Sequence, residues 1–214
     1  RTNYDALLNY NKNFGKHNIK GLLGWHTEKY NYKYQKAVRK KFPNNELTDM
    51  NAGDASTQSN EGYTAELAMI SWFARINYDF AGKYLLEANI RADASSRFAE
   101  GHRWGYFPAA AFGWRLSEET FMEGTKDWLD NLKVRLSYGT VGNDGISSDL
   151  WSQTWTSETD LRYQYILNNQ YSSSYDLSTE QMANKNLKWE TTITRNFGFD
   201  FGFLKNRLWG SLDL

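Results

Sequence analysis

Strict alternation of apolar and polar side chains constrains the fold of this chain more than any other feature. Between Met69 and Phe80 the even-numbered positions are apolar or aromatic, and most odd-numbered positions are polar or charged. A period of two residues predicts a β-strand with one apolar and one polar face. The segment Tyr84–Asp93 repeats the pattern, and the two apolar faces coincide if Phe80 opposes Tyr84. Residues 81–83, which include a glycine, then form the turn of a hairpin.

The same alternation predicts further strands along the chain. In the segment 188–203, Trp189, Ile193 and four phenylalanines share an apolar face that only Arg195 interrupts. Because only about 10 residues of a barrel strand cross the hydrocarbon, we expect Arg195 near a rim. All segments together predict an all-β fold of about eight antiparallel strands. The remaining predicted strands are Tyr4–Phe14, Asn18–His26, Pro108–Leu116, Leu132–Gly139 and one that begins near Leu208.

The connections between these strands are short at one edge and long at the other, which is typical of a transmembrane β-barrel with its large loops outside. A mean hydropathy of −0.74 is compatible with this fold, because a barrel strand needs an apolar residue only at every second position. The short side comprises residues 15–17, 81–83, 204–207 and 117–131, the last with enough Glu, Met, Trp and Leu for a helical turn or two; the long side comprises 29–65, 97–103 and 143–185.

Charged residues gather on the polar faces of the predicted strands. The core of a β-sandwich needs bulky side chains on its inner faces, whereas these faces suit a water-filled lumen. Neighbouring strands would bring the charges together as a ladder of pairs. The alternative is that they only solvate the inner wall. The residues concerned are Arg75, Glu87, Arg91, Asp93, Arg115, Lys133 and Arg135.

Aromatic residues mark two further candidate features. In the long connection 143–185, rings lie among Ser, Asn and Gln, as a sugar-binding surface requires. The alternative is that they pack the loop against itself or a lipoprotein partner, which is the more frequent role of such rings. These are Trp151, Trp155, Tyr163, Tyr165, Tyr171 and Tyr175. Rings near strand ends are candidates for the girdles of a barrel at the membrane interfaces: Tyr78, Phe80, Tyr84, Phe107, Phe112 and Trp114.

The sequence predicts neither an enzyme nor a cofactor or metal site. Its three histidines are scattered without metal-ligand spacing, and no nucleophile elbow is present. Asp49, Asn51 and Asp54 resemble part of a calcium loop that lacks its closing glutamate. The formal net charge of zero also argues against nucleic acid as a partner.

Several motifs in family order resemble the barrel of SusC/RagA-type TonB-dependent transporters of Bacteroidetes. The resemblance covers roughly residues 70–214, and a small departure is Ala94, where the family would have glycine. The motifs are Arg75–Asp93 (RINYDFAGKYLLEANIRAD), Ser95–Phe98 (SSRF), Arg103–Pro108 (RWGYFP), Gly113–Glu119 (GWRLSEE), Leu132–Gly139 (LKVRLSYG), Gly142–Ile146 (GNDGI) and Asn186–Glu190 (NLKWE).

This resemblance implies that residues 1–214 are part of a barrel of about 22 strands in the bacterial outer membrane, without the plug domain. It also implies import of an oligosaccharide or peptide, a SusD-like surface lipoprotein as partner, and energy from a TonB-ExbB-ExbD complex. The alternatives are a passive porin or adhesin barrel and a soluble carbohydrate-binding β protein.

Overall fold

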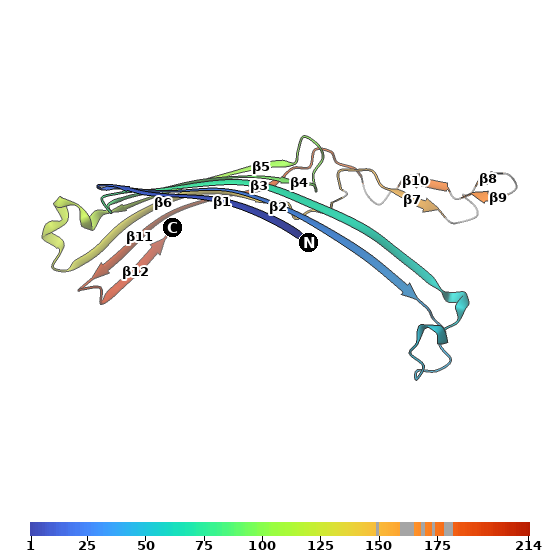
Figure 1. The fold of residues 1–214 in the computed structure, drawn as a ribbon. Helices are drawn as coiled ribbons and strands as arrows, with labels where there is room; N and C mark the ends of the chain where they lie inside the picture. The colour runs from blue at the N-terminus through green and yellow to red at the C-terminus, as the bar shows by residue number, and fades with distance from the viewer. Residues whose placement is uncertain (149, 159–164, 168–169, 173, 178–181) are drawn as a thin grey trace.

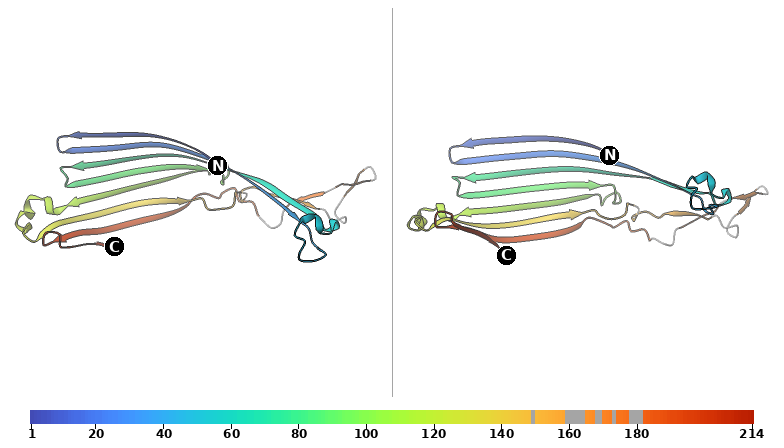
Figure 2. Two further views of the ribbon diagram at one scale, coloured as in Figure 1. Left: turned by 60° about the horizontal axis from the view of Figure 1, so that its bottom comes forward. Right: turned by 90° about the horizontal axis from the view of Figure 1, so that it is seen from below.

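The main part of the chain forms one curved antiparallel sheet in a single layer (Figures 1 and 2). The computed structural model describes residues 1–148, 150–158, 165–167, 170–172, 174–177 and 182–214. Within these residues the main sheet has eight strands in the order β1-β2-β3-β4-β5-β6-β11-β12, and every neighbouring pair is antiparallel. The predicted all-β antiparallel fold is therefore confirmed.

The strands of the main sheet follow the predicted segments and extend several of them. Two small two-stranded sheets lie in the connection between β6 and β11, pairing β7 with β10 and β8 with β9. The main strands are β1 (Thr2–Phe14), β2 (His17–Val38), β3 (Ser59–Phe80), β4 (Tyr84–Ser95), β5 (Trp104–Arg115), β6 (Leu129–Asn143), β11 (Glu190–Phe203) and β12 (Leu208–Asp213); the short ones are β7 (Trp155–Glu158), β8 (Tyr165–Leu167), β9 (Gln170–Ser172) and β10 (Ser174–Leu177).

In the described part of the chain, helical structure is confined to short 3₁₀ turns in the connections. Two lie in the β2–β3 connection, η1 (Met50–Ala52) and η2 (Ala55–Thr57), and two in the β5–β6 connection, η3 (Leu116–Glu118) and η4 (Thr120–Thr125). The expected helical turns in residues 117–131 are thus present. No helix among the described residues is long and apolar enough to cross a membrane.

Phe80 stands opposite Tyr84, as the alternation predicts, and the turn between them is tight. Ala81 and Gly82 both have positive φ angles, 55° and 69°. Such a turn matches the twist of the flanking strands. The carboxylate of Asp79 accepts a 2.7 Å hydrogen bond from the backbone N–H of Gly82 and holds the turn closed.

The pairing registers align the apolar rows of neighbouring strands on one face of the sheet. Trp72 lies opposite Trp25, and Leu86 lies opposite both Tyr78 and Phe112. None of the large apolar side chains of this row is buried: some, such as Trp25, Tyr78 and Phe80, are half-buried, and others are exposed, among them Phe112 at 36% and Leu8 at 68%. No second sheet among the described residues covers them, so the two-layer sandwich is not the observed fold.

The opposite, polar face is the more crowded one. Ser71, Asp93 and Ser95, all on polar rows, are buried. Side chains converge on the inside of a curved sheet and diverge on its outside. The polar rows therefore line the inner side of the curve.

Successive short turns do not lie on one row of hydrogen-bonded residues but are shifted along the strand direction from one hairpin to the next. The row that contains Phe80 passes through Tyr84, Trp114 and Val134 to Phe199 of β11, yet β11 continues to Phe203. A stagger of this kind accompanies the tilt of strands in a barrel. It places Arg195 eight residues before Phe203, the same separation along the strand as from Trp72 to Phe80. The position of Arg195 near a rim remains a prediction.

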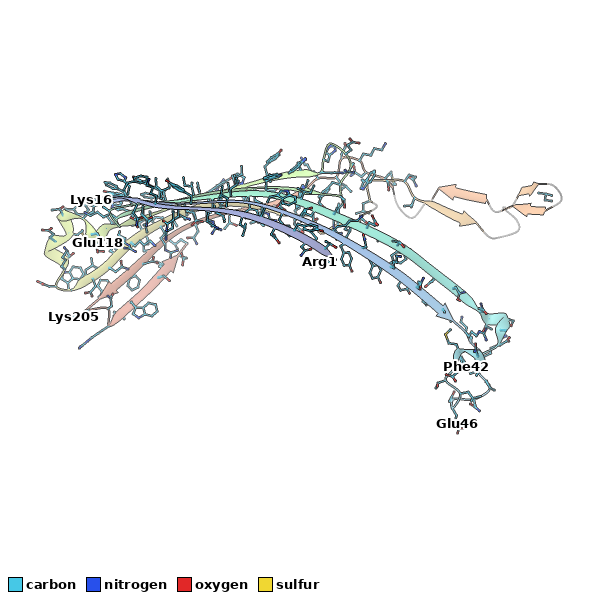
Figure 3. The ribbon with its side chains drawn as sticks, viewed as in Figure 1. Arg1, Lys16, Phe42, Glu46, Glu118 and Lys205 are labelled. Atoms are coloured by element: carbon cyan, nitrogen blue, oxygen red, sulfur yellow. The ribbon has the colours of Figure 1, made fainter. Side chains whose placement is uncertain are left out.

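The short turns gather at one end of the molecule and the long connections at the other. Figure 3 shows Lys16, Glu118 and Lys205 at the first end, and Phe42 and Glu46 at the far tip of the β2–β3 hairpin. The predicted sorting of connections by length is therefore present in the structure.

The β2–β3 connection is much shorter than expected. Residues 29–38 and 59–65, expected in a loop of 29–65, are paired strand, so that only 39–58 connect β2 to β3. The apolar row ends near Lys29, and the alternation beyond it consists of tyrosines and polar residues. The criterion of an apolar outer row therefore missed this part of the hairpin.

Candidate functional site

The charged residues of the polar face form ion pairs within and between strands. Arg91 Nε lies 2.7 Å from the carboxylate of Asp93, and Arg75 Nε lies 3.7 Å from that of Glu87. Arg91 also donates to the hydroxyl of Ser71 and lies over the ring of Phe73. The structure thus brings these four charged residues together in two pairs. Their exposure to a lumen remains a prediction.

Arg135 joins three strands of the sheet. Its guanidinium lies 2.9 Å from Asp200 on β11 and 2.9 Å from Asp213 on β12, and Lys133 lies 3.8 Å from Asp200. The two aspartates were not among the predicted ladder residues, although the alternation placed Asp200 on the polar face. Arg115 stands opposite Lys133 in the register and so faces another cation.

At the end of the sheet that carries the long connections, the β4–β5 loop is tied to the segment that follows β6. Ser95 donates a 2.8 Å hydrogen bond to the carboxylate of Asp144, and Arg97 Nε lies 3.7 Å from the same carboxylate. Arg97 also donates to the carbonyl oxygen of Ile146. These contacts explain the SSRF and GNDGI motifs, because each motif supplies half of the tie.

Next to this tie is a cavity of about 270 Å³, which we call the mouth hollow. It is lined by Glu28, Tyr30, Leu67, Met69, Arg97 and Asp144, together with Ala68 and Ser95. Its polar lining consists of two carboxylates, a guanidinium and two hydroxyl groups. Such a set can bond the rim of a polar ligand without itself performing chemistry.

Three aromatic rings pack together where the β4–β5 loop meets the sheet. Phe98 is fully buried, and its ring centroid lies 5.4 Å from that of Trp189, which in turn lies 5.3 Å from that of Phe107. Trp189 Nε1 donates a 2.8 Å hydrogen bond to the carbonyl oxygen of Arg103. A Cβ at Gly142 would overlap the Phe107 ring, so glycine is required for this packing.

The ring cluster corrects two predictions. Phe107 is not a girdle residue, because Pro108 occupies the apolar row and Phe107 is buried on the polar face. Trp189 does not share the apolar face of β11, because the strand begins only at Glu190 and the indole turns to contact Phe98 and Phe107.

The other predicted girdle residues line the short-turn end of the apolar face. Phe80, Tyr84 and Trp114 are in consecutive ring contact at 6.2 Å. Glu119, from the GWRLSEE motif, reaches this group, and its carboxylate accepts hydrogen bonds from the hydroxyl of Tyr84 at 2.6 Å and from Trp114 Nε1 at 3.1 Å. The hydrogen bond from Tyr84, followed by those from Trp114 and Lys83, holds the pKa of Glu119 below its ordinary value.

The aromatic residues predicted to bind sugar in the 143–185 connection are only partly described. Trp151 is half-buried, and its indole N–H is buried without a hydrogen-bond partner. Tyr163 lies outside the described residues. Trp155, Tyr165, Tyr171 and Tyr175 belong to the backbones of β7, β8, β9 and β10, and their side chains also lie outside the description. Their binding role remains a prediction.

The sequence interpretation missed a second set of aromatic residues, on the projecting part of β2 and β3. Tyr30, Tyr32, Tyr34 and Tyr63 form a continuous series of ring contacts, which we call the tyrosine ladder. The sequence signal was Tyr30-Asn-Tyr-Lys-Tyr34, a period-two pattern of tyrosines within a segment assigned to a loop.

Within the described residues, no three acidic or histidine side chains gather as a metal-ion site. Asp54, from the partial calcium-like pattern, caps η2 instead. Its side chain accepts hydrogen bonds from the backbone N–H and the hydroxyl of Ser56, and these lower the pKa of Asp54.

The family model for TonB dependent receptor-like β-barrels matches residues 1–214. The chain belongs to this family. TonB-dependent receptor SusC of Bacteroides thetaiotaomicron is 36% identical over 166 residues, which are 75% of this chain and 16% of SusC. TonB-dependent receptor P39 of Formosa agariphila is 35% identical over 211 residues, which are 98% of this chain and 19% of P39.

The solved structures agree with this assignment. The RagAB peptide transporter superposes with a TM-score of 0.83 at 26% identity, covering 99% of this chain and 22% of the RagAB chain. The chain thus spans about a fifth of the length of these relatives. TonB-dependent receptor barrels lie in the bacterial outer membrane, so the apolar face of the sheet is its lipid side and the chain is a segment of a larger barrel.

Proposed function

We propose that the protein containing this chain is the channel of an energised nutrient importer, and that it performs no catalysis. The observation that carries the proposal is the sidedness of the sheet, with exposed apolar rings on one face and paired charges on the other. A wall of this kind separates lipid from a hydrated interior. Family membership supports the role of a TonB-ExbB-ExbD complex as the energy source.

The proposed cargo is an oligosaccharide or a peptide, delivered with a SusD-like lipoprotein as partner. Likeness to SusC supports the lipoprotein, and likeness to the RagAB peptide transporter supports a peptide. Cargo would be bound at the long-connection end and released at the short-turn end.

Growth of a deletion strain on single glycans and peptides as carbon source tests the proposal. Loss of growth on one cargo, restored by the full-length gene, is the expected result. Unchanged growth on every cargo would contradict import. Uptake of a labelled cargo, measured with and without a protonophore, distinguishes the importer from a passive porin. Uptake through a porin persists without an energised inner membrane, whereas energised import stops.

A further inference from the structure

The β2–β3 hairpin exchanges the character of its two faces where it leaves the apolar band. Up to Trp25 and Trp72 the outer row is apolar and the inner row is mostly polar. Beyond the ion pair of Lys29 with Glu66, at 3.1 Å, the outer row becomes polar and the inner row carries the tyrosine ladder. The pairing register continues through this change, so the ladder lies on the same face as the charged wall.

The four rings of the ladder are close to one another; three of them are exposed and Tyr34 is half-buried. Tyr32 and Tyr63 have ring centroids 5.9 Å apart, and Tyr34 and Tyr63 have theirs 5.3 Å apart. Tyr30 and Tyr32 lie nearly parallel at 6.5 Å. The exposed fractions of Tyr30, Tyr32 and Tyr63 are 39%, 38% and 59%. A row of contacting rings on one face of a hairpin offers a surface on which the apolar face of a ligand can pack.

The ladder leads into the mouth hollow. Tyr30 is both the last ring of the ladder and part of the lining of this cavity. A ligand lying along the rings would therefore meet the carboxylates of Glu28 and Asp144 and the guanidinium of Arg97 at one end.

The electrostatics of this face favour an uncharged ligand. Within residues 28–38 and 59–69 of the inner row, the charged side chains are Glu28, Lys36 and Glu61, and all have partners. Arg1 lies 2.6 Å from Glu28, and Lys36 lies 2.9 Å from Glu61. Peptide termini and phosphate groups would have to displace these pairs, whereas sugar hydroxyls can hydrogen-bond to them as they stand.

We propose that the tyrosine ladder is a binding surface for a neutral oligosaccharide, which it leads into the mouth hollow. The apolar CH faces of sugar rings pack on the tyrosines, while the tyrosine hydroxyls and the lining of the hollow bond the sugar hydroxyls. Rings on alternate residues of one strand are about 6.7 Å apart, so that several sugar units are held in series. The inference names the cargo class of the proposed importer and rests on that function only for the direction of movement.

Binding by the full-length protein in detergent tests the ladder. The probe is a mixture of 2-aminobenzamide-labelled oligosaccharides from partial acid hydrolysis of starch, xylan, mannan and laminarin. The test variant combines Tyr30→Ala, Tyr32→Ala and Tyr63→Ala. The matched control combines Asn31→Ala, Lys33→Ala and Thr64→Ala on the opposite face of the same hairpin. Heat-modifiable migration on gels establishes that each variant is folded.

We expect the wild type and the control to retain labelled sugar, and the ladder variant to bind it about tenfold or more weakly, since three stacking contacts are lost. Equal losses in variant and control would overturn the proposal. So would absence of sugar retention by the wild type, or ladder-dependent retention of tryptic casein peptides instead. Because binding in detergent needs no energy source, sugar retention combined with unchanged growth of the deletion strain would reject import and leave the ladder standing.

Discussion

At the scale of single residues, Glu119 shows how a connecting segment is attached to the apolar face. Its side chain is only 14% exposed and receives hydrogen bonds from Tyr84 and Trp114, which belong to the ring series of the short-turn end. Lys83 Nζ, 3.3 Å away, adds a charge of opposite sign. The carboxylate therefore joins β4, β5 and the β5–β6 connection at one point.

Replacing Glu119 by Gln should lower the thermal stability of the full-length barrel by a few degrees at neutral pH. Because the pKa of Glu119 is lowered in the folded protein, its stabilising contribution is complete above the ordinary carboxylate pKa. The contribution disappears as the pH falls through the lowered value. The melting temperatures of wild type and E119Q should therefore converge in acid. The exposed neighbour Glu118 is the control, and an E118Q variant with the same loss would contradict this account.

Gly142→Ala should destabilise the barrel by about 1–3 kcal/mol, because the added methyl group overlaps the ring of Phe107 and forces the cluster apart. Gly139→Ala is the control on the same strand, since its new Cβ would lie 3.4 Å from that of Ala109 and would meet no aromatic ring. The measurement is the temperature at which the folded form disappears from unboiled gels. A stable G142A protein would show that Phe107 can move.

At the scale of elements, the tip of the β2–β3 hairpin is organised by its own contacts. Arg39 donates to the carbonyl oxygen of Gly53 and to the side chain of Gln58, and Lys40 accepts and donates hydrogen bonds across the same loop. Replacing residues 40–57 by a short glycine-containing turn should therefore leave the amount and heat stability of the assembled protein unchanged. Immunoblots of outer membranes, before and after heating, measure both. Loss of assembly would mean that the tip contacts other parts of the barrel.

Most strands of the sheet could be predicted from the sequence. A strand that contacts lipid needs an apolar side chain at every second position, and this alternation is visible in the sequence. The register of β3 with β4 followed from their apolar rows alone. Beyond Lys29 lipid no longer selects the outer side chains, so the strands there had no apolar row to find. Trp189 was misplaced because its non-local contacts with Phe98 and Phe107, which alternation cannot encode, decide where the indole turns. Phe107 lies on the polar row that the alternation itself assigns to it, so its assignment to a girdle was wrong.

The proposed binding residues were harder to predict than the strands that form the wall of the barrel. The wall repeats one rule over many residues, whereas binding depends on which rings meet in space. The partners of Arg135 and the contacts of Tyr63 both come from other strands. The sequence could identify aromatic and polar composition, but not the pairing that makes Tyr30, Tyr32, Tyr34 and Tyr63 one surface.

At the scale of the whole molecule, the two faces of the sheet should tolerate charge very differently. Ile76 lies midway between Trp72 and Phe80 on the apolar row and is half exposed. Ile76→Arg should cost about 2–4 kcal/mol and reduce the protein in the outer membrane, because arginine would lie near the middle of the bilayer. Asn77→Arg, one residue along on the polar face, should be tolerated. Equal abundance of the two variants would contradict the assigned sides.

The continuous pairing of β2 with β3, from His17–Phe80 to Val38–Ser59, has a mechanical consequence. Its register runs without a shift through 22 opposed pairs, from the short-turn end to the tip of the hairpin. Two strands bonded along their full length bend as one stiff beam. A force applied at the tip of this hairpin would therefore be carried by both strands together into the main sheet, where it would act on the neighbouring strands.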